Sequence, residues 1–187
     1  MKKERCAWVK HEEEIEYHDK EWGTPSHDDA YMFEMLILEG FQAGLSWITI
    51  LKKRENFRRA FDDFDYNIIK NYKEDKIEEL LKDEGIIRNK LKVNSTVINA
   101  KAFIQVQKEY GSFSNYIWQF TDNKQIINHW KELKDFPAKT ELSDKISKDM
   151  KKRGFKFVGS TIIYSFLQAV GIIDDHMINC PYKNKKN

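Results

Sequence analysis

Residues that interrupt helices are scarce in this sequence. Eight glycines and three prolines are spread over 187 residues, and no glycine- or serine-rich linker divides the chain. Strand-like alternation of apolar and polar residues is also rare, and residues 155–158 are the one short candidate. Long helices are therefore favoured over many short strands, and we predict an all-α fold in one unit that covers residues 1–187.

Apolar residues recur at helical spacing along the chain. Asp28 or Asp29 can cap a helix that runs to about Glu39 and breaks at Gly40, and Ser46 can cap the next helix. Further helices are predicted at residues 66–72, 75–84, 89–110, 112–121, 123–132, 143–153 and 158–170, with Ser112 and Ser143 as N-caps and Gly171 as a stop.

The charges nearly cancel. The chain has 32 Lys and Arg residues against 30 Asp and Glu residues, for a formal net charge of +2. Binding to nucleic acid therefore requires that the basic residues gather on one face. No apolar run approaches the roughly 18 residues of a membrane span, and no apolar segment typical of a secretion signal follows the first residues. Composition predicts a cytoplasmic protein without a membrane partner.

Cys6 and Cys180 lie near opposite ends of the chain, and each has a histidine nearby. His176 precedes Cys180 by four positions, so a helix would place both on one face. Together with Cys6 and His18 they form a Cys2His2 set, the composition of a structural zinc site that leaves no position for water. The spacing alone leaves two interpretations equally open: a zinc ion that joins the two ends, or four unpaired side chains.

A carboxylate interrupts the apolar stripe of the first predicted helix. Glu39 follows Leu36, Met35 and Met32 by three, four and seven positions. If the helix frays after this residue, the carboxylate reaches water and has no special role. If the helix continues, the buried carboxyl must find hydrogen-bond donors or take up a proton, and a ligand in a pocket can supply the donors.

Aromatic residues are frequent near Glu39 in the sequence. Such residues are most often part of a core or its boundary. Flat rings beside a carboxylate also suit a purine, because its faces stack on aromatic side chains and its edge donates hydrogen bonds. The residues concerned are Tyr17, Trp22, Phe41 and Trp47.

A tight helical corner carries a cluster of cations. One helix stops at Gly85 and another starts within a few residues, beside Arg88, Lys90 and Lys92. Unpaired backbone N–H groups at the start of a helix, with cations beside them, suit a DNA phosphate. An ordinary corner with solvated charges is the alternative. We predict a basic DNA-binding face centred on residues 85–92.

Taken together, these segments resemble one protein family. The sequence is similar to the bacterial 3-methyladenine DNA glycosylase I family over about residues 4–182, with little similarity in residues 60–80 and 105–150. The segments that carry the resemblance are residues 5–8 (RCAW), 17–23 (YHDKEWG), 33–35 (FEM), 38–47 (LEGFQAGLSW), 51–56 (LKKREN), 85–88 (GIIR), 152–159 (KRGFKFVG) and 175–180 (DHMINC).

The resemblance implies a helix-hairpin-helix DNA glycosylase fold. Its central helical part would cover about residues 45–140, and a structural zinc ion would hold the N- and C-terminal segments together. The implied function is base-excision repair: hydrolysis of the N-glycosidic bond of 3-methyladenine in alkylated double-stranded DNA, with the free base and an abasic site as products. The enzyme would be monofunctional, without strand nicking, and we expect a monomer. The implied zinc ligands are Cys6, His18, His176 and Cys180.

The resemblance also implies roles for single residues. Glu39 would be the catalytic residue that contacts the edge of the damaged base. Tyr17 and Trp47 would stack on that base, and Trp22 and Ser165 would lie near the pocket. The family is thought to dispense with the aspartate that most helix-hairpin-helix glycosylases use to support the sugar cation. The residues that would fill the gap left by the flipped nucleotide are Gln42, Gly44 and Leu45.

Two other functions remain open at this point. The protein could recognise alkylated DNA without cleaving a bond, which a test for base release would reveal. It could also nick the strand, which requires a lysine nucleophile in the pocket, such as Lys90, Lys92 or Lys152. A purely structural role leaves the carboxylate and the aromatic residues unexplained.

Overall fold

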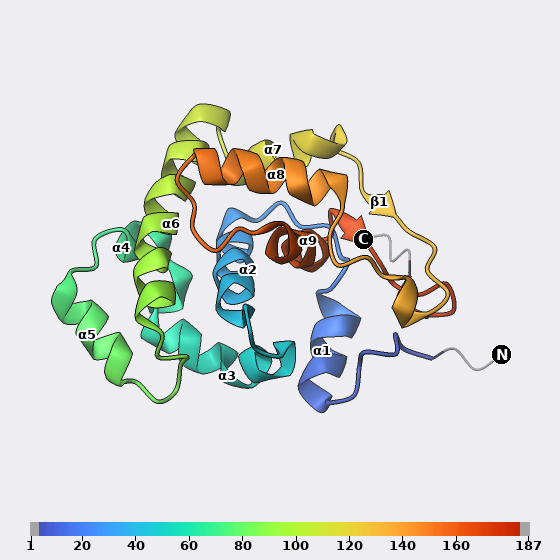
Figure 1. Cartoon of the computed structure of the whole chain (residues 1–187), viewed down its shortest axis with the longest axis horizontal. Helices are drawn as coiled ribbons and strands as arrows, with labels where there is room; N and C mark the ends of the chain where they lie inside the picture. The colour runs from blue at the N-terminus through green and yellow to red at the C-terminus, as the bar shows by residue number, and fades with distance from the viewer. Residues whose placement is uncertain (1–3, 184–187) are drawn as a thin grey trace.

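The protein is seen in a computed structural model that describes residues 4–183 (Figure 1). The predicted unit of residues 1–187 extends beyond this range at both ends. The helices are α1 (Glu12–Lys20), α2 (Asp29–Gln42), α3 (Trp47–Ala60), α4 (Tyr66–Ile69), α5 (Glu74–Lys82), α6 (Lys90–Tyr110), α7 (Phe113–Trp118), α8 (Glu141–Lys152) and α9 (Ser160–Ala169). Three short 3-10 turns, Asp62–Phe64, Gln119–Thr121 and Leu133–Asp135, and two strands, β1 (Ile126–Ile127) and β2 (Ile173–Asp174), complete the described part.

Helix α2 is the centre of the fold. Helices α3, α6, α7 and α9 all pack against it, and Figure 1 shows it in the middle of the molecule. Every side chain from Met32 to Phe41 is buried, acidic residues included. Because α2 is surrounded on several sides, its last turns can carry a polar group into the interior, and Glu39 is such a group.

Helix α2 begins where the sequence predicts and ends later. The Asp28 side chain accepts a hydrogen bond from the backbone N–H of Ala30 at 2.9 Å, which makes Asp28 the N-cap. The predicted break at Gly40 is wrong, because the helix continues to Gln42. Gly40 serves packing instead: a Cβ atom there would lie 3.3 Å from Cβ of Phe157.

Three other predictions of secondary structure need correction. Residues 123–132 do not form a helix; they contain β1, which pairs in parallel with β2 and places Ile126 opposite Ile173. Residues 155–158 are a turn rather than a strand, and Phe157 has a φ of 54°. The N-cap of α8 is Thr140 and not Ser143, which lies inside that helix. The predicted caps Ser112 and Asp28 are confirmed.

The two ends of the described chain meet. The backbone N–H of Met177 donates to Sγ of Cys6 at 3.3 Å, although 171 positions separate the two residues. The β1–β2 pair contributes to this arrangement, because it holds the segment after α9 in place. Among the helices of residues 4–183, none has both the length and the apolar character needed to cross a membrane.

Arg54 of α3 ties together the helices that carry the site. Its guanidinium donates two hydrogen bonds to Glu21, just after α1, both at 2.8 Å, and one to Glu34 of α2 at 2.6 Å. A buried arginine is stable only with such partners. Arg54 therefore links α3 to α2 and to the end of α1.

Candidate active site

A cavity of about 310 Å³ opens where α1, α2, α3 and α9 converge. Tyr17 comes from α1, Glu39 and Gln42 from the end of α2, and Trp47 from the first turn of α3. The complete lining is Trp8, Glu14, Tyr17, Trp22, Glu39, Gln42, Trp47, Leu133, Phe136, Ser165 and Gln168. The five residues expected at the base or near its pocket therefore lie around one cavity, although they span residues 17 to 165 of the sequence.

Glu39 is buried in the wall of this cavity. Its side chain lies in the intact part of α2, its exposed fraction is 3%, and its Oε2 has no hydrogen-bond partner among residues 4–183. Desolvation raises the pKa of Glu39 to about 8. The possibility that Glu39 frays into water is thus excluded. Within residues 4–183, Oε2 is therefore left for a ligand in the cavity that Glu39 lines.

Two aromatic rings at the cavity contact each other in a tilted arrangement. The ring centroids of Tyr17 and Trp47 lie 5.2 Å apart, with an angle of 55° between the ring planes. Burial raises the pKa of Tyr17 well above its ordinary value, so its hydroxyl stays protonated. Nε1 of Trp47 is buried and lacks a partner within the described chain. Phe41 is different: it packs on Phe57 in the core and does not line the cavity.

Sequence reasoning missed several residues of the lining. Gln168 lies one helical turn after Ser165 on α9, so helical spacing was a signal that could have identified it. Trp8 follows Cys6 by two positions, and Glu14 lies on α1, a helix that the sequence pattern did not predict. Leu133 and Phe136 belong to an irregular segment, and no sequence pattern connects them with the site.

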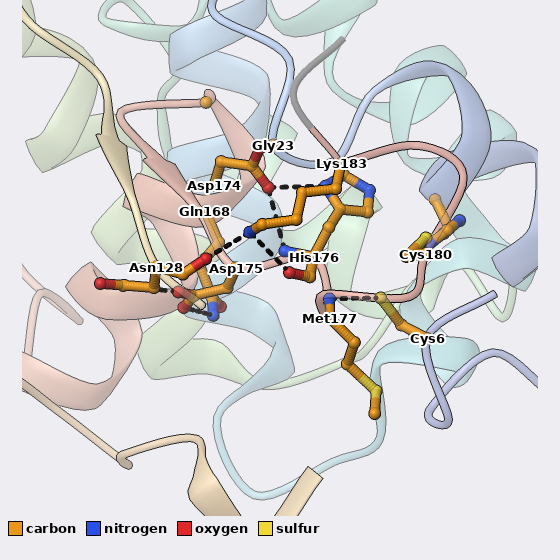
Figure 2. A network of polar contacts seen from close by, with 12 residues as sticks. Cys6, Gly23, Asn128, Gln168, Asp174, Asp175, His176, Met177, Cys180 and Lys183 are labelled. Carbon is orange, nitrogen blue, oxygen red and sulfur yellow. Dashed lines mark hydrogen bonds and ion pairs between the residues drawn. The ribbon is translucent and has the colours of Figure 1, made fainter. Parts of the chain in front are cut away.

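A buried aspartate orients one of these missed residues (Figure 2). The amide Nε2 of Gln168 donates to Oδ2 of Asp175 at 2.6 Å, which turns the amide oxygen of Gln168 away from the carboxylate. Asp175 also accepts hydrogen bonds from Asn128 and Trp130, both at 2.7 Å, and from the hydroxyl of Tyr164. Asp175 itself is outside the lining of the cavity, and its contacts give it a structural role behind Gln168.

Three of the four expected metal ligands form one cluster. Sγ of Cys6, a ring nitrogen of His18 and Sγ of Cys180 lie within 4.8 Å of one another, and all three residues are buried. The hydrogen bond with Cys6 lowers the pKa of the Cys180 thiol to about 4. His176 lies beside the cluster, with its ring centroid 4.8 Å from that of His18.

The two histidines are oriented alike. Nδ1 of His18 donates to Asp19, and Nδ1 of His176 donates to Asp174, both at 2.8 Å. Nε2 of His176 is buried and has no partner in the described chain, and Nε2 of His18 lies 3.5 Å from Sγ of Cys180. A carboxylate behind each imidazole is the arrangement that presents Nε2 to a metal ion, so the donor set fits zinc.

The metal cluster and the cavity share a wall. The indole of Trp22 stacks against the His18 ring at 5.9 Å and meets the His176 ring edge-on at 4.7 Å. On its other side Trp22 lines the cavity and contacts Trp8, with 5.0 Å between ring centroids. Whatever holds the two ends of the chain together therefore also supports one wall of the cavity.

An exposed loop borders the cavity after α2. Gln42 lines the cavity, Gly44 is exposed and has a φ of 80°, and Leu45 has 40% of its surface exposed. A φ in this range is readily adopted only by glycine. An exposed leucine at the edge of a cavity is available to a large partner.

The predicted corner forms between α5 and α6. The N–H of Gly85 donates to Asp83, and Lys53 donates to the carbonyls of Glu84 and Gly85. Arg88 and Lys90 are exposed, as expected, and their nearest acidic partners lie at 3.5 and 3.7 Å. Both cations are accessible to a phosphate group.

Lys92 does not lie on the exposed face that was predicted for it. Its side chain is buried, and Nζ donates to the backbone carbonyls of Phe41 at 2.8 Å and Ala43 at 2.6 Å. The prediction that Lys92 binds a phosphate is therefore corrected, because the first turn of α6 directs this side chain toward the end of α2. Among the residues that the structure describes, Lys90, Lys92 and Lys152 are outside the lining of the cavity.

A helical protein with an aromatic cavity, a buried carboxyl group in its wall and an exposed loop at its edge has the features of proteins that bind a nucleobase outside the DNA helix. Comparisons with known proteins agree with this class. A model of the methyladenine glycosylase family matches residues 8–184. The chain therefore belongs to the methyladenine glycosylase family.

Individual relatives cover nearly the whole chain. The DNA-3-methyladenine glycosylase of Haemophilus influenzae is 46% identical over 180 residues, which are 96% of this chain and 97% of that protein. DNA-3-methyladenine glycosylase 1 of Escherichia coli is 46% identical over 178 residues, 95% of each chain. The crystal structure of a variant 3-methyladenine DNA glycosylase I in complex with 3-methyladenine has a TM-score of 0.94 at 34% identity, covering 98% of this chain and 99% of that one.

Proposed function

We propose that this protein hydrolyses the N-glycosidic bond of 3-methyladenine in alkylated double-stranded DNA, releasing the free base and leaving an abasic site. The observation that carries the proposal is the buried carboxyl of Glu39, unpartnered within the described chain, in the wall of an aromatic cavity. The names of the relatives support it, since both curated relatives are DNA-3-methyladenine glycosylases. The related crystal structure contains 3-methyladenine itself.

The chemistry depends on the charge of the damaged base. Methylation at N3 makes the adenine in DNA formally cationic, so its glycosidic bond is already weak and needs no acid to protonate the leaving group. The protein must extrude the base, bind it and admit water. Tyr17 and Trp47 both line the cavity and would offer ring surface to the base, and Glu39 would accept hydrogen bonds from its N6 edge. Trp22 and Ser165 complete the surrounding wall.

The protonation state of Glu39 provides selectivity for 3-methyladenine over adenine. With a pKa of about 8, the carboxyl is mostly protonated in the free protein at neutral pH. A cationic base beside it favours the ionised form, so binding and loss of the carboxyl proton support each other. Normal adenine carries no positive charge, so it does not favour the ionised form and the carboxyl stays protonated. The cavity therefore discriminates by charge in a site shielded from water.

The remaining expected contacts concern the duplex. Gln42 lines the cavity, and Gly44 and Leu45 follow it in the exposed loop, where a group must replace the extruded nucleotide in the helix. Arg88 and Lys90, with the N–H groups at the start of α6, would bind the phosphate backbone as part of a helix-hairpin-helix motif made by α5 and α6. Gly85 permits the tight turn, since a Cβ atom there would lie 2.9 Å from Asp83 and 3.1 Å from Asn56.

A structural zinc ion belongs to the same proposal. Cys6, His18, His176 and Cys180 would hold it, and all four positions filled by protein leave none for a reactive water. The ion would join the two ends of the chain and support Trp22 at the cavity wall. The catalytic steps depend on the cavity residues and not on the metal.

The direct test is incubation of the wild-type protein with methylated duplex DNA, followed by chromatography of the released bases. We expect 3-methyladenine and intact strands that contain abasic sites. Binding to alkylated DNA with no released base would favour the alternative of a recognition protein. Strand cleavage without added base or heat would favour the nicking alternative. A monomeric state and a cytoplasmic location stay predictions, and size-exclusion chromatography tests the first.

A further inference from the structure

The buried ammonium group of Lys92 has no role in the chemistry proposed above. Lys92 lies in the first turn of α6, and only 7% of its surface is exposed. Its Nζ donates to the carbonyl oxygens of Phe41, at 2.8 Å, and of Ala43, at 2.6 Å. Burying a charged lysine costs free energy, and the hydrogen bonds of its ammonium group must compensate for the water that it loses. Both acceptors belong to the end of α2.

The end of α2 needs a partner of this kind. The last carbonyls of a helix have no N–H donors of their own, and a positive charge nearby is favourable. The last turn of α2 contains no basic residue. The backbone bond that closes this turn, from N–H of Ala43 to the carbonyl of Gly40, is long at 3.4 Å. The ammonium group of Lys92 therefore supplies the hydrogen-bond donor and the positive charge that the last turn of α2 lacks.

This contact lies directly before the exposed loop at the edge of the cavity. Ala43 is the last residue before Gly44, whose φ of 80° is a conformation that glycine adopts readily, and it is followed by the exposed Leu45. Holding the carbonyl of Ala43 determines where the chain leaves α2 and hence the direction in which Leu45 projects. The N–H of Leu45 also donates to the carbonyl of Gln42 at 2.7 Å, so Lys92 acts together with this backbone bond in fixing the turn.

We propose that Lys92 is a positioning residue that preforms the Ala43–Leu45 segment for entry into the DNA duplex. The proposal rests on the proposed function, since a preformed segment is useful only if a base is extruded. Lys92 belongs to the same helix as Lys90 and lies just after the corner with Arg88. Helix α6 therefore joins the DNA-binding corner and the inserted segment in one rigid element.

The test compares substrates that do and do not need an inserted segment. Lys92→Met removes the donor and keeps the length of the side chain, and Lys101→Met removes an exposed charge from the same helix as a matched control. Three quantities are measured for each: single-turnover release of 3-methyladenine from methylated duplex, release from methylated single strands, and the Kd for free 3-methyladenine from tryptophan fluorescence. We expect Lys92→Met to lower duplex release by about tenfold, as displacement of a positioning group does.

The two other quantities should stay within about twofold of wild type, because neither involves a gap in a duplex. A double-mutant cycle with Leu45→Ala adds a second test. In a protein that already carries Leu45→Ala, Lys92→Met should lower the rate of release from the duplex by less than about twofold. If Lys92→Met lowers all three quantities equally, Lys92 merely supports the cavity and the proposal is wrong. An unchanged rate on the duplex overturns it as well.

Two further outcomes are distinguishable. If Lys92→Met unfolds, Lys92→Gln replaces it, because glutamine keeps an N–H donor with a shorter reach. The same three quantities are measured, and the loss on the duplex relative to the single strand and to the free base decides. If the wild-type protein releases no 3-methyladenine from either DNA, the proposed function fails and the Lys92 proposal fails with it. If the wild type is active and the ratio between duplex and single strand does not change, only the Lys92 proposal fails.

Discussion

Glu39 and Trp47 face the same cavity, and each has a buried polar atom, Oε2 and Nε1, that has no partner among residues 4–183. The two residues lie on successive helices, α2 and α3, on either side of the exposed loop that carries Leu45. Buried polar groups in proteins are normally hydrogen-bonded. Nε1 of Trp8, which lines the same cavity, also lacks a partner within residues 4–183, so one acceptor and two donors indicate a ligand with a polar edge.

Glu39 should control the pH dependence of base release. Because kcat/KM reports the free enzyme and the pKa of Glu39 is about 8, kcat/KM should rise with pH as this carboxyl ionises. Glu39→Gln should lower the rate by on the order of tenfold to a hundredfold and abolish this rise. Rates of 3-methyladenine release between pH 6 and 9 decide the matter. A variant with the wild-type profile would show that another group titrates.

Glu39 should also make the folded state less stable at high pH. Burial raises its pKa from the ordinary 4.5 to about 8, so the folded protein binds more protons than the unfolded protein between these values. The free energy of unfolding contributed by this group therefore falls as pH rises through that window. Glu39→Gln should resemble wild type at pH 5 and be more stable at pH 9, by on the order of 2–4 kcal/mol.

Urea denaturation at the two pH values measures this difference. Glu78→Gln, which changes an exposed carboxyl on α5, is the matched control and should shift stability equally little at both. A difference between Glu39→Gln and wild type that does not vary with pH would mean that the Glu39 carboxyl is already ionised in the folded protein.

Loss of one metal ligand should release the two ends of the chain. Protein purified without added zinc should contain about one zinc ion per chain, and Cys180→Ser should lower both the zinc content and the melting temperature. A structural zinc site typically contributes several kcal/mol to folding. The exposed His129, changed to alanine, provides a control that leaves zinc in place. Metal-free wild-type protein that melts like the variant would refute the zinc assignment.

The corner between α5 and α6 should contribute nonspecific DNA affinity. Arg88→Ala and Lys90→Ala each remove an exposed cation and should weaken binding to damaged and undamaged duplexes alike. Each change should also reduce the slope of log K against log salt by about one unit. Fluorescence anisotropy at several salt concentrations measures this slope. If Lys101→Ala, on the same helix, produces the same loss, the effect is one of net charge and not of the corner.

Gly171 should tolerate no side chain. Its φ is 72°, and a Cβ atom there would lie 2.1 Å from the carbonyl carbon of Thr24. Gly154, with a φ of 93°, has open space around it among the described residues and serves as the control. Gly154→Ala should cost about 1–2 kcal/mol from backbone strain alone, whereas Gly171→Ala should cost clearly more. Thermal melting compares the two, and equal costs would mean that the segment at Thr24 moves aside.

Local sequence patterns predicted much of the helical structure. Asp28 and Ser112 cap helices as expected, because a short polar side chain satisfies the free N–H groups of a first turn wherever it occurs. The helix expected at residues 123–132 was wrong, because pairing of Ile126 with Ile173 decides that segment. A contact across 47 positions leaves no periodic trace in either segment.

The residues of the candidate site also fall into those that the sequence indicated and those that only the structure revealed. Glu39 on an apolar stripe and the aromatic residues near it in sequence indicated a pocket, and the resemblance named its members. Trp8 and Phe136 line the same cavity but were not found. Their place depends on how the two ends of the chain and an irregular loop pack, and no local pattern records that packing.

The sequence by itself determined the helical fold, the two Cys/His pairs and the carboxylate on an apolar stripe, because each depends on residue type and on spacing within a few turns. Tertiary structure alone decided that Gly40 is a packing position rather than a break, since the reason is Phe157, far along the chain. It also decided that Lys92 binds the end of α2 and not DNA. The physical reason is common to both: burial and hydrogen-bond partners are set by contacts between distant segments, which spacing along one helix cannot specify.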